Sequence, residues 1–329
     1  MKKTVSVVIP NYNGKKLLEM YLPSVIKALK SGGVTYELII VDDCSRDDSV
    51  KFISTQYPGV KLLINKQNKG FSATCNHGIA AATMELTFLL NSDVQLTPDY
   101  FDSQWKYFQF SDTFGVMGRI MSKDGKRIED AARILYYSGC RIKANRFYYK
   151  QNPDELSYTA YLSGANALVD TKKLKELGGF DEIFSPFSSE DSDLSTRAWL
   201  LGWKCYYDHS SVCYHQVSGS IRKNIKSRFV NTIYFRNRFI FQQIHLSGAR
   251  LTILPAYIWT VEVLAKLMIG KFWILESYRD YLSKGSRIRA SKSKLNALQA
   301  KYASSITLED VMETINASIA GQPIIRVGK

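Results

Sequence analysis

The stretch Leu89-Leu90-Asn91-Ser92-Asp93 decides the fold of this 329-residue chain, because it places a carboxylate directly after a run of apolar residues. Leu86 to Leu90 has the length and composition of a strand that is buried on both faces, as in a parallel sheet. Ligands of such sheets bind beyond the carboxyl ends of the strands. Asp93 is therefore predicted to lie in a binding site.

Strand-like runs recur along the first hundred residues, namely Val5 to Ile9, Leu38 to Val41, Lys61 to Ile64 and Leu86 to Leu90. Between the first two, an apolar stripe with helical spacing extends from Leu17 to Leu29. Alternating strands and helices predict an α/β fold with a doubly wound, mostly parallel sheet. Polar segments follow the strands at 10–13, 42–47, 65–70 and 91–93, and we expect them to meet at one edge of the sheet.

The later sequence is organised differently. After Thr97 we expect shorter strands at 115–121 and 161–169, with a polar, aromatic insert at 133–149. A helix is predicted to follow Ser188 and Ser189, with a serine N-cap and acidic residues in its first turn. A further short helix is expected within 306–329.

Positive charge is concentrated near the C-terminus. The whole chain has a formal charge of +14, and residues 221–301 contain sixteen Lys and Arg against three Asp and Glu, which gives +13. Such a block attracts polyanions, and the candidates are an anionic membrane surface, a nucleic acid or a phosphate-bearing substrate.

The five cysteines form an odd set without a C-x-x-C pair, so the pattern indicates neither a disulfide framework nor a zinc site. The N-terminal residues lack the pattern of a signal peptide. We therefore expect a cytoplasmic protein with reduced thiols.

Leu251 to Gly270 is apolar enough and long enough to cross a bilayer, but Glu262 and Lys266 lie near its middle, where charge is costly. We favour a helix that lies in the membrane interface, flanked by basic and aromatic residues. The alternative is an ordinary amphipathic helix packed on the catalytic domain.

Several motifs, in order, resemble those of glycosyltransferase family 2, whose members have the GT-A fold. The first half contains Val5-Ser-Val-Val-Ile-Pro-Asn-Tyr-Asn-Gly14, Leu38-Ile-Ile-Val-Asp-Asp-Cys-Ser-Arg-Asp47, Asn68-Lys-Gly-Phe-Ser-Ala-Thr-Cys-Asn-His-Gly78 and the Asn91-Ser92-Asp93 run. The second half contains Leu162-Ser-Gly-Ala-Asn-Ala-Leu-Val-Asp170, Leu177-Gly-Gly-Phe-Asp-Glu182 and Ser189-Glu-Asp-Ser-Asp-Leu194.

The resemblance implies a GT-A catalytic domain at 1–220, with a nucleotide-binding half at 1–97 and an acceptor-binding and catalytic-base half at 98–220. Residues 221–329 would form a basic, aromatic, mostly helical region that associates with a membrane.

The tips of the first two strands provide candidates for holding the nucleotide. Pro10 and Tyr12 follow the first strand, and Tyr12 is placed to stack on the base. By resemblance, Asp43 accepts a hydrogen bond from a pyrimidine ring nitrogen. The alternative for the polar residues around it, particularly Ser45 and Asp47, is that they cap the next helix.

The phosphates and a metal ion have their own candidates. Gly70 permits close backbone approach at a loop that turns into a helix, whose N-terminus favours phosphate. Asn91-Ser92-Asp93 takes the place of the family's Asp-x-Asp motif, so Asp93 would bind Mg²⁺ or Mn²⁺. His215 resembles the histidine that completes this site, although a lone histidine after a strand is also commonly structural.

By resemblance the catalytic base is Asp191. Acidic residues are favoured in the first turn of any helix, so simple capping is the alternative for Glu190 and Asp193. Gly164, with Ala165, would border the sugar, and Phe187 would line the acceptor entrance.

These assignments predict an inverting, metal-dependent transferase that uses a nucleotide-diphosphate sugar, UDP- or dTDP-linked. The Tyr234-Phe-Arg-Asn-Arg238 run and the basic segment after it are similar to bacterial members that build O-antigen or capsular polysaccharides. The acceptor would then be a polyprenyl-linked glycan, and the enzyme would lie peripherally on the inner face of the plasma membrane.

Other classes fit less well. A nucleotidyltransferase would have a glycine-rich basic loop after the first strand, and a dehydrogenase would have a G-x-G-x-x-G turn; this chain has Pro10-Asn-Tyr-Asn-Gly14 there. A glycosidase would have two carboxylates flanking one bond, whereas this chain offers one candidate base and one candidate metal ligand. Charge alone allows a nucleic-acid-binding protein, but the basic block coincides with an apolar run rather than a recognisable binding module, so we expect no nucleic acid partner. A further alternative is a catalytically silent homologue that binds the donor without transferring its sugar.

Overall fold

A computed structural model describes residues 4–152, 154–216 and 227–327. Within these ranges, ten strands form a central sheet whose main path is β10-β12-β6-β11-β4-β1-β2-β3, with β5 on β12 and β7 on β6. A smaller sheet has the order β13-β9-β8. Strands β1 to β4 are mutually parallel, so the predicted parallel-dominated α/β architecture is confirmed.

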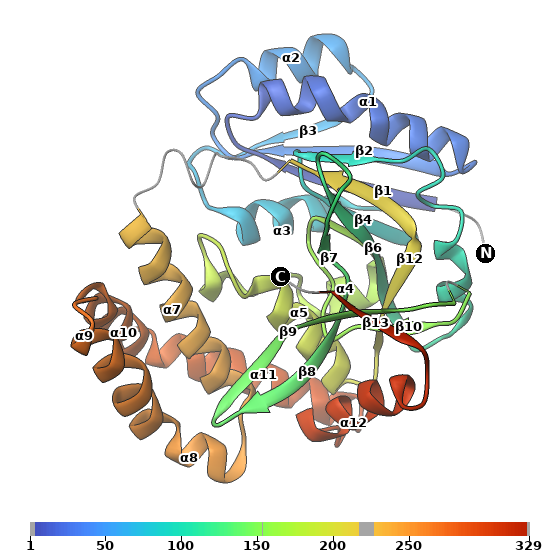
Figure 1. Cartoon of the computed structure of the whole chain (residues 1–329). Coiled ribbons are helices and arrows are strands. Elements are labelled where there is room, and N and C mark those ends of the chain that lie inside the picture. The colour runs from blue at the N-terminus through green and yellow to red at the C-terminus, as the bar shows by residue number, and fades with distance from the viewer. Residues whose placement is uncertain (1–3, 153, 217–226, 328–329) are drawn as a thin grey trace.

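The N-terminal half alternates strands and helices as the sequence predicts (Figure 1). Helices α1 and α2 lie on one side of β1–β3, and α3 lies on the other. The bounds are β1 Thr4–Asn11, α1 Lys15–Ser31, β2 Thr35–Asp42, α2 Ser49–Gln56, β3 Lys61–Ile64, α3 Phe71–Ala81, β4 Leu86–Leu90 and β5 Val94–Leu96.

Alternation of side chains along β1 explains why both faces of the sheet carry helices. Val5 and Val7 belong to the hydrophobic cluster that contains Leu22 of α1, whereas Val8 belongs to the cluster that contains Ile79 of α3. Successive residues of a strand point to opposite faces, so an entirely apolar strand requires cover on both.

The second half completes the sheet with mixed directions, since β11 is antiparallel to both β4 and β6 while β12 is parallel to β6. The strand expected at 161–169 begins only at Asn166, because a turn closed by the Asn166 N–H on the Ser163 carbonyl occupies the preceding residues. The bounds are η1 Gln104–Gln109, β6 Thr113–Ser122, β7 Ile128–Asp130, β10 Ser157–Tyr158, β11 Asn166–Asp170, α4 Thr171–Leu177, η2 Glu182–Phe184, α5 Glu190–Leu200 and β12 Lys204–His215.

The polar, aromatic insert folds as a hairpin of β8 (Ala132–Ser138) and β9 (Arg141–Lys150). Strand β13 (Ile324–Val327), which the sequence did not predict, pairs with β9. The expected short helix near the C-terminus is α12 (Leu308–Ile319), and it begins with a capping box between Thr307 and Asp310.

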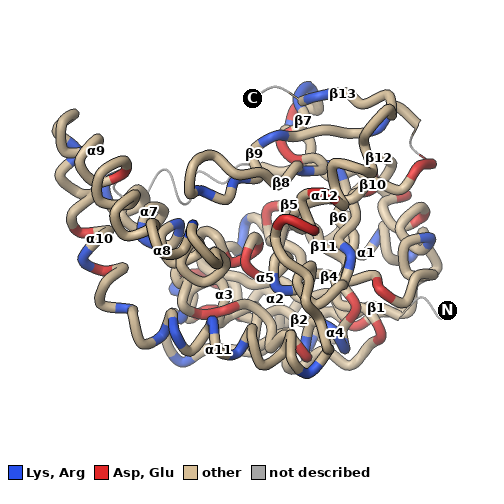
Figure 2. The backbone as a smooth tube through the Cα atoms, turned by 90° about the horizontal axis from the view of Figure 1, so that it is seen from below, with Lys and Arg blue, Asp and Glu red and all other residues tan. Residues whose placement is uncertain are grey.

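The C-terminal helices pack against the sheet domain. Ile240 and Ile244 of α7 belong to the same hydrophobic cluster as Leu194 and Ala198 of α5. Lys and Arg recur along α11, as Figure 2 shows. The predicted boundary at residue 220 lies outside the described residues and stays a prediction. The bounds are α7 Ser227–His245, α8 Gly248–Tyr257, η3 Ile258–Leu264, α9 Ala265–Met268, α10 Trp273–Ser283 and α11 Gly285–Lys301.

The apolar stretch forms one continuous helix, Gly248–Met268, with a π-helical segment at its centre. In the part of the chain that the structure describes, this is the one helix long and apolar enough to cross a bilayer, a criterion that core helices of soluble proteins also meet. Leu254, Ile258 and Val263 are buried against the domain, whereas Trp259 and Met268 are exposed. One side of the helix therefore packs and another side does not.

Gly78 allows α3 to lie close to the sheet, because a Cβ atom there would be 2.5 Å from Cγ1 of Val8 and 3.1 Å from Cγ2 of Val41. Alanine favours a helix interior over glycine by about 1 kcal/mol, but overpacking against stiff valines costs roughly 1–3 kcal/mol. Gly78→Ala should therefore lower the free energy of unfolding by about 1 kcal/mol in urea titrations. Gly59→Ala is the control, because Gly59 has open space around it; equal effects of the two substitutions would contradict this packing argument.

Candidate active site

A cavity of about 630 Å³ lies at the carboxyl ends of the parallel strands. It brings together every site residue that the sequence analysis named, although these come from separate parts of the chain. The roles assigned to them stay predictions. The predicted residues on its wall are Pro10, Tyr12, Asp43, Gly70, Asn91, Asp93, Gly164, Asp191 and His215, together with Ala165 and Phe187.

The strand tips position the nucleotide candidates. Tyr12, just after β1, is 51% exposed, so its ring is available for stacking. The buried Asp43 follows β2, and its carboxylate accepts hydrogen bonds from the backbone N–H groups of Lys69 (2.9 Å) and Gly70 (2.9 Å) and from Asn65 Nδ2 (2.8 Å). Asp43 therefore holds the glycine loop against the cavity.

The residues beside Asp43 have structural partners. Asp47 accepts hydrogen bonds from the N–H and hydroxyl of Ser49 at the start of α2, so capping explains it. Ser45 does not bond to α2; its hydroxyl accepts from the backbone N–H of Asn13 (2.8 Å) and so joins the tips of β1 and β2.

Gly70 has a left-handed backbone, with φ of +82°. A Cβ atom there would lie 3.1 Å from Cα of Pro186, and the Phe71 N–H at the start of α3 donates to the Pro186 carbonyl. The close approach that glycine permits is therefore to the loop before α5. A contact between Gly70 and phosphate stays a prediction.

Asp93 and His215 lie close together on the wall of the cavity. The Nε2 atom of His215 lies 3.4 Å from Asp93 Oδ1, and its Nδ1 atom lies 3.4 Å from Glu129 Oε2. Burial opposes a charge on this imidazole, but hydrogen bonding to Asp93 and Glu129 outweighs it and raises the pKa of His215 above its usual value. The sequence analysis missed Glu129, whose only signal was its place in a charged segment just before the polar insert.

These residues fit a divalent cation that is completed by other oxygen ligands. Across the described ranges, no group of three or more His, Cys, Asp and Glu side chains is arranged to hold a metal. Within the same ranges, the buried Oδ1 atom of Asn91 has no hydrogen-bond partner. Asn91 lines the same cavity as Asp93. Mg²⁺ commonly takes one or two carboxylates together with phosphate and water oxygens, so this donor set is sufficient.

Two adjacent carboxyl groups, Glu190 and Asp191, begin α5. Burial raises the pKa of Asp191, and the Gly164 backbone N–H and the charge of Arg133 oppose this. Burial and the neighbouring Asp191 raise the pKa of Glu190 further. Two adjacent buried carboxyl groups disfavour two negative charges, so the pair favours sharing one proton, and a base requires the ionised form.

The position of the Asp191 side chain explains why residue 164 is a glycine. A Cβ atom at Gly164 would lie 2.6 Å from Oδ1 of Asp191, closer than any side chain could tolerate. The glycine therefore lets this carboxylate reach the cavity wall.

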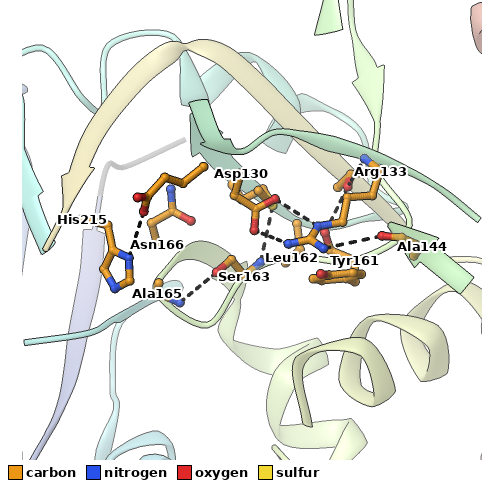
Figure 3. A network of polar contacts seen from close by, with 12 residues as sticks. Asp130, Arg133, Ala144, Tyr161, Leu162, Ser163, Ala165, Asn166 and His215 are labelled. Atoms are coloured by element: carbon orange, nitrogen blue, oxygen red, sulfur yellow. Dashed lines mark hydrogen bonds and ion pairs between the residues drawn. The ribbon is translucent and has the colours of Figure 1, made fainter. Parts of the chain in front are cut away.

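A polar network beside the base was also missed. Asp130 pairs with Arg133 through both carboxylate oxygens, including a 3.0 Å contact to Nε, and the guanidinium lies 4.0 Å from the ring centre of Tyr161 (Figure 3). Asp130 lines the cavity, while Arg133 provides positive charge near Asp191. The charged residues at 123–133 were the one available signal.

Asp193 is not a simple capping residue, because it is buried and accepts from Arg197 Nε (2.7 Å) and His245 Nε2 (2.8 Å). Burial opposes its charge, but Arg197 and His245 lower the pKa of Asp193. Arg197 also donates to the carbonyls of Leu177 and Gly179. This network joins α5 to α7 and to the Leu-Gly-Gly motif.

The expected serine occupies the N-cap position of α5, but it does not cap the helix through its side chain. The backbone of Ser189 is left-handed (φ of 75°), and its side chain makes no capping hydrogen bond. The loop is held from outside instead. The buried Asn237 of α7 donates to the carbonyls of Phe187 (2.8 Å), Ser188 (2.8 Å) and Phe184.

Comparison with known proteins decides the family. The model described as "Glycosyl transferase family 2" matches residues 6–178, which is more than half of the chain. The chain belongs to glycosyltransferase family 2. The resemblance noted in the sequence is thereby confirmed.

This glycosyltransferase is similar to several named relatives. It is 23% identical, over 75% of this chain and 87% of the relative, to N-acetylglucosaminyl-diphospho-decaprenol L-rhamnosyltransferase of Mycobacterium tuberculosis strain H37Rv. It is 33% identical to dolichol-phosphate mannosyltransferase of Pyrococcus furiosus, over 29% of this chain and only 27% of that protein.

Solved structures show the GT-A fold. GalNAc-T7 with UDP, GalNAc and Mn²⁺ has a TM-score of 0.65 and 14% identity, covering 98% of this chain and 58% of that chain. S. aureus TarS 1–349 in complex with UDP-GlcNAc has a TM-score of 0.53 and 16% identity, covering 98% of this chain and 93% of that chain.

Asn237→Leu preserves side-chain size but leaves the carbonyls of the loop before α5 without their donor. Each unsatisfied buried group costs roughly 1–3 kcal/mol, so we expect a loss of about 2 kcal/mol in the free energy of unfolding, measured in urea. Asn231→Leu, on the exposed side of the same helix, is the control and should change it by less than about 0.5 kcal/mol. Equal stability of the two variants would show that Asn237 does not hold this loop.

Proposed function

We propose that this family 2 glycosyltransferase transfers a sugar, with inversion, from a nucleotide-diphosphate donor to a hydroxyl group of a polyprenyl-linked glycan. The proposal rests on one observation above all: Asp93 and Asp191, which lie 98 positions apart in the chain, line the same cavity at the carboxyl ends of the sheet. One acid is placed for the diphosphate and the other for the attacking hydroxyl.

The donor would occupy the side of the cavity formed by the tips of β1 and β2. Tyr12 would stack on the base, and Pro10 and Asp43 would border it, with Asp43 also keeping the glycine loop in place. UDP- or dTDP-linked sugars fit this arrangement best. The names of GalNAc-T7 with UDP and of TarS with UDP-GlcNAc support a uridine donor.

Asp191 would remove the proton of the acceptor hydroxyl as it attacks the anomeric carbon from the face opposite the nucleotide. Burial and the neighbouring Asp191 raise the pKa of Glu190, which would favour a proton on Glu190 and so avoid a second buried negative charge. Gly164 leaves the space that the carboxylate needs. Attack from the opposite face inverts the anomeric configuration.

Asp93 and His215 would hold Mg²⁺ or Mn²⁺, with Asn91 beside them. When bound, such a cation supplies positive charge that stabilises the departing diphosphate. Glu129 would orient the imidazole of His215 through its other ring nitrogen, as partners of metal-binding histidines commonly do.

The acceptor and the cellular location are inferred from the relatives and from the surface. The M. tuberculosis relative is named for a decaprenol-diphosphate acceptor. The Gly248–Met268 helix exposes apolar side chains, and basic residues are frequent in the helices after it. These features favour peripheral attachment to the inner face of the plasma membrane, in a pathway of cell-surface polysaccharide synthesis.

Asp191→Asn tests the base. General-base catalysis typically contributes 10²- to 10⁴-fold, so kcat should fall by that range while donor affinity changes less than about twofold. Turnover is measured by nucleotide release with the donor that gives the largest thermal shift in a panel of nucleotide sugars with Mn²⁺. Full activity of Asp191→Asn would refute the assignment, and the absence of a stabilising donor in the panel would refute the proposed function.

The pH profile gives a second test. Asp191 must be ionised to act, so activity should increase as pH rises through its pKa. Because burial raises the pKa of Asp191, the acidic limb of log(kcat/KM) should have its midpoint clearly above the value of about 4 that is usual for aspartate. A midpoint at or below about 4 would contradict this, and the residual activity of Asp191→Asn should lack this limb.

A further inference from the structure

A second cavity, of about 430 Å³, adjoins the first. The two share Glu190 and Asp191, so the proposed base lies on the wall between them. The remaining walls come from the β8–β9 hairpin, the loop before α5 and the inner side of α7. Figures 1 and 2 show this hairpin extending toward α7 and α8.

The second cavity is lined by cations on the side of the hairpin and α7. These are Arg133, Arg141, Lys143 and Arg238. Arg133 is already paired with Asp130. Arg141 and Arg238 both pair with one carboxylate, the buried Glu262, with a 3.0 Å contact to Arg141. The two arginines therefore share a single acidic partner.

The side-chain ammonium group of Lys143 makes no hydrogen bond or ion pair with any residue in the ranges the structure describes, although its backbone belongs to the β8–β9 pair. Partial burial, followed by the positive charges of Arg141 and Arg238, lowers the pKa of Lys143. The positive charges of Arg141, Lys143 and Arg238 repel one another, and a bound anion would offset this repulsion. The cluster of Arg141, Lys143 and Arg238 is therefore an anion site by charge and by position.

The surroundings indicate which anion. Glu262 belongs to the Gly248–Met268 helix, so the carboxylate that organises the cluster also fixes this helix beside it. Val261 and Leu264, on either side of Glu262, are exposed. A ligand in this cavity would meet the positive charge of Arg141, Lys143 and Arg238 together with the carboxylate of Asp191. Glu262 ties the two arginines to the helix that exposes Val261 and Leu264.

We propose that Arg141, Lys143 and Arg238 bind the diphosphate of a lipid-linked acceptor, with its lipid along the Gly248–Met268 helix and its sugar directed to Asp191. This inference rests on the proposed function and names the group by which the acceptor is held. The donor diphosphate is assigned to the other cavity, near Asp93. A bilayer headgroup would also be anionic, but it has no reason to occupy a recess that contains the base.

The test uses the full chain and farnesyl diphosphate as the probe, with titration calorimetry in saturating UDP and Mn²⁺. Lys143→Gln removes a positive charge without removing a structural contact. The affinity of the protein for farnesyl diphosphate should therefore fall about tenfold. Lys143→Arg should restore most of the affinity. The matched control is Lys271→Gln, an exposed lysine just after the same helix, which should change the affinity less than twofold.

Two further measurements separate the possible explanations. UDP affinity should be the same in Lys143→Gln and in the unmodified protein; if the unmodified protein binds no nucleotide, the proposed function itself fails. Binding to vesicles of phosphatidylglycerol and phosphatidylcholine should be weakened no more by Lys143→Gln than by Lys271→Gln.

Three results would overturn the inference. They are competition between UDP and farnesyl diphosphate, unchanged farnesyl diphosphate affinity in Lys143→Gln, and a Lys143→Gln defect confined to vesicle binding. The last result would assign the cluster to bilayer headgroups.

Discussion

The arrangement of the site depends on keeping two neighbouring carboxyl groups buried at the start of α5. Burying Glu190 and Asp191 together is costly, and the protein offsets this cost by leaving a proton on one of them and placing a backbone N–H and an arginine near the other. The start of the helix must also be immobile. Asn237 holds the preceding loop, and His245 reaches Asp193 within the first turn.

Both of these side chains come from α7, which explains why the basic C-terminal region is part of the catalytic unit. Helix α7 positions the base from one end, and through Arg238 it contributes to the wall of the second cavity. The apolar helix that follows is fixed to the same wall by Glu262. In the proposed mechanism, the elements that bind the acceptor therefore also position the base.

The two cavities divide the chemistry by charge. The first presents carboxylates beside His215, which suits a cation and the diphosphate that it accompanies. The second presents arginine and lysine, which suit an anion without a metal. Glu190 and Asp191 line both cavities, and in the proposed mechanism Asp191 is the group that both substrates approach. A single buried carboxylate thereby sets the direction in which the acceptor must enter.

The sequence by itself determined the parallel strands and the polar residues at their tips, because these follow from local periodicity and from the rule that strand ends share an edge. The later residues of the first cavity, Gly164, Asp191 and His215, were found only through the resemblance of ordered motifs to glycosyltransferase family 2. The sequence did not reveal the contacts made by Glu129 and Arg133, nor the hydrogen bonds by which Asn237 holds the loop before α5. Only the tertiary structure decided these, because each acts through a contact with a distant segment, and such contacts leave no periodic pattern along the chain.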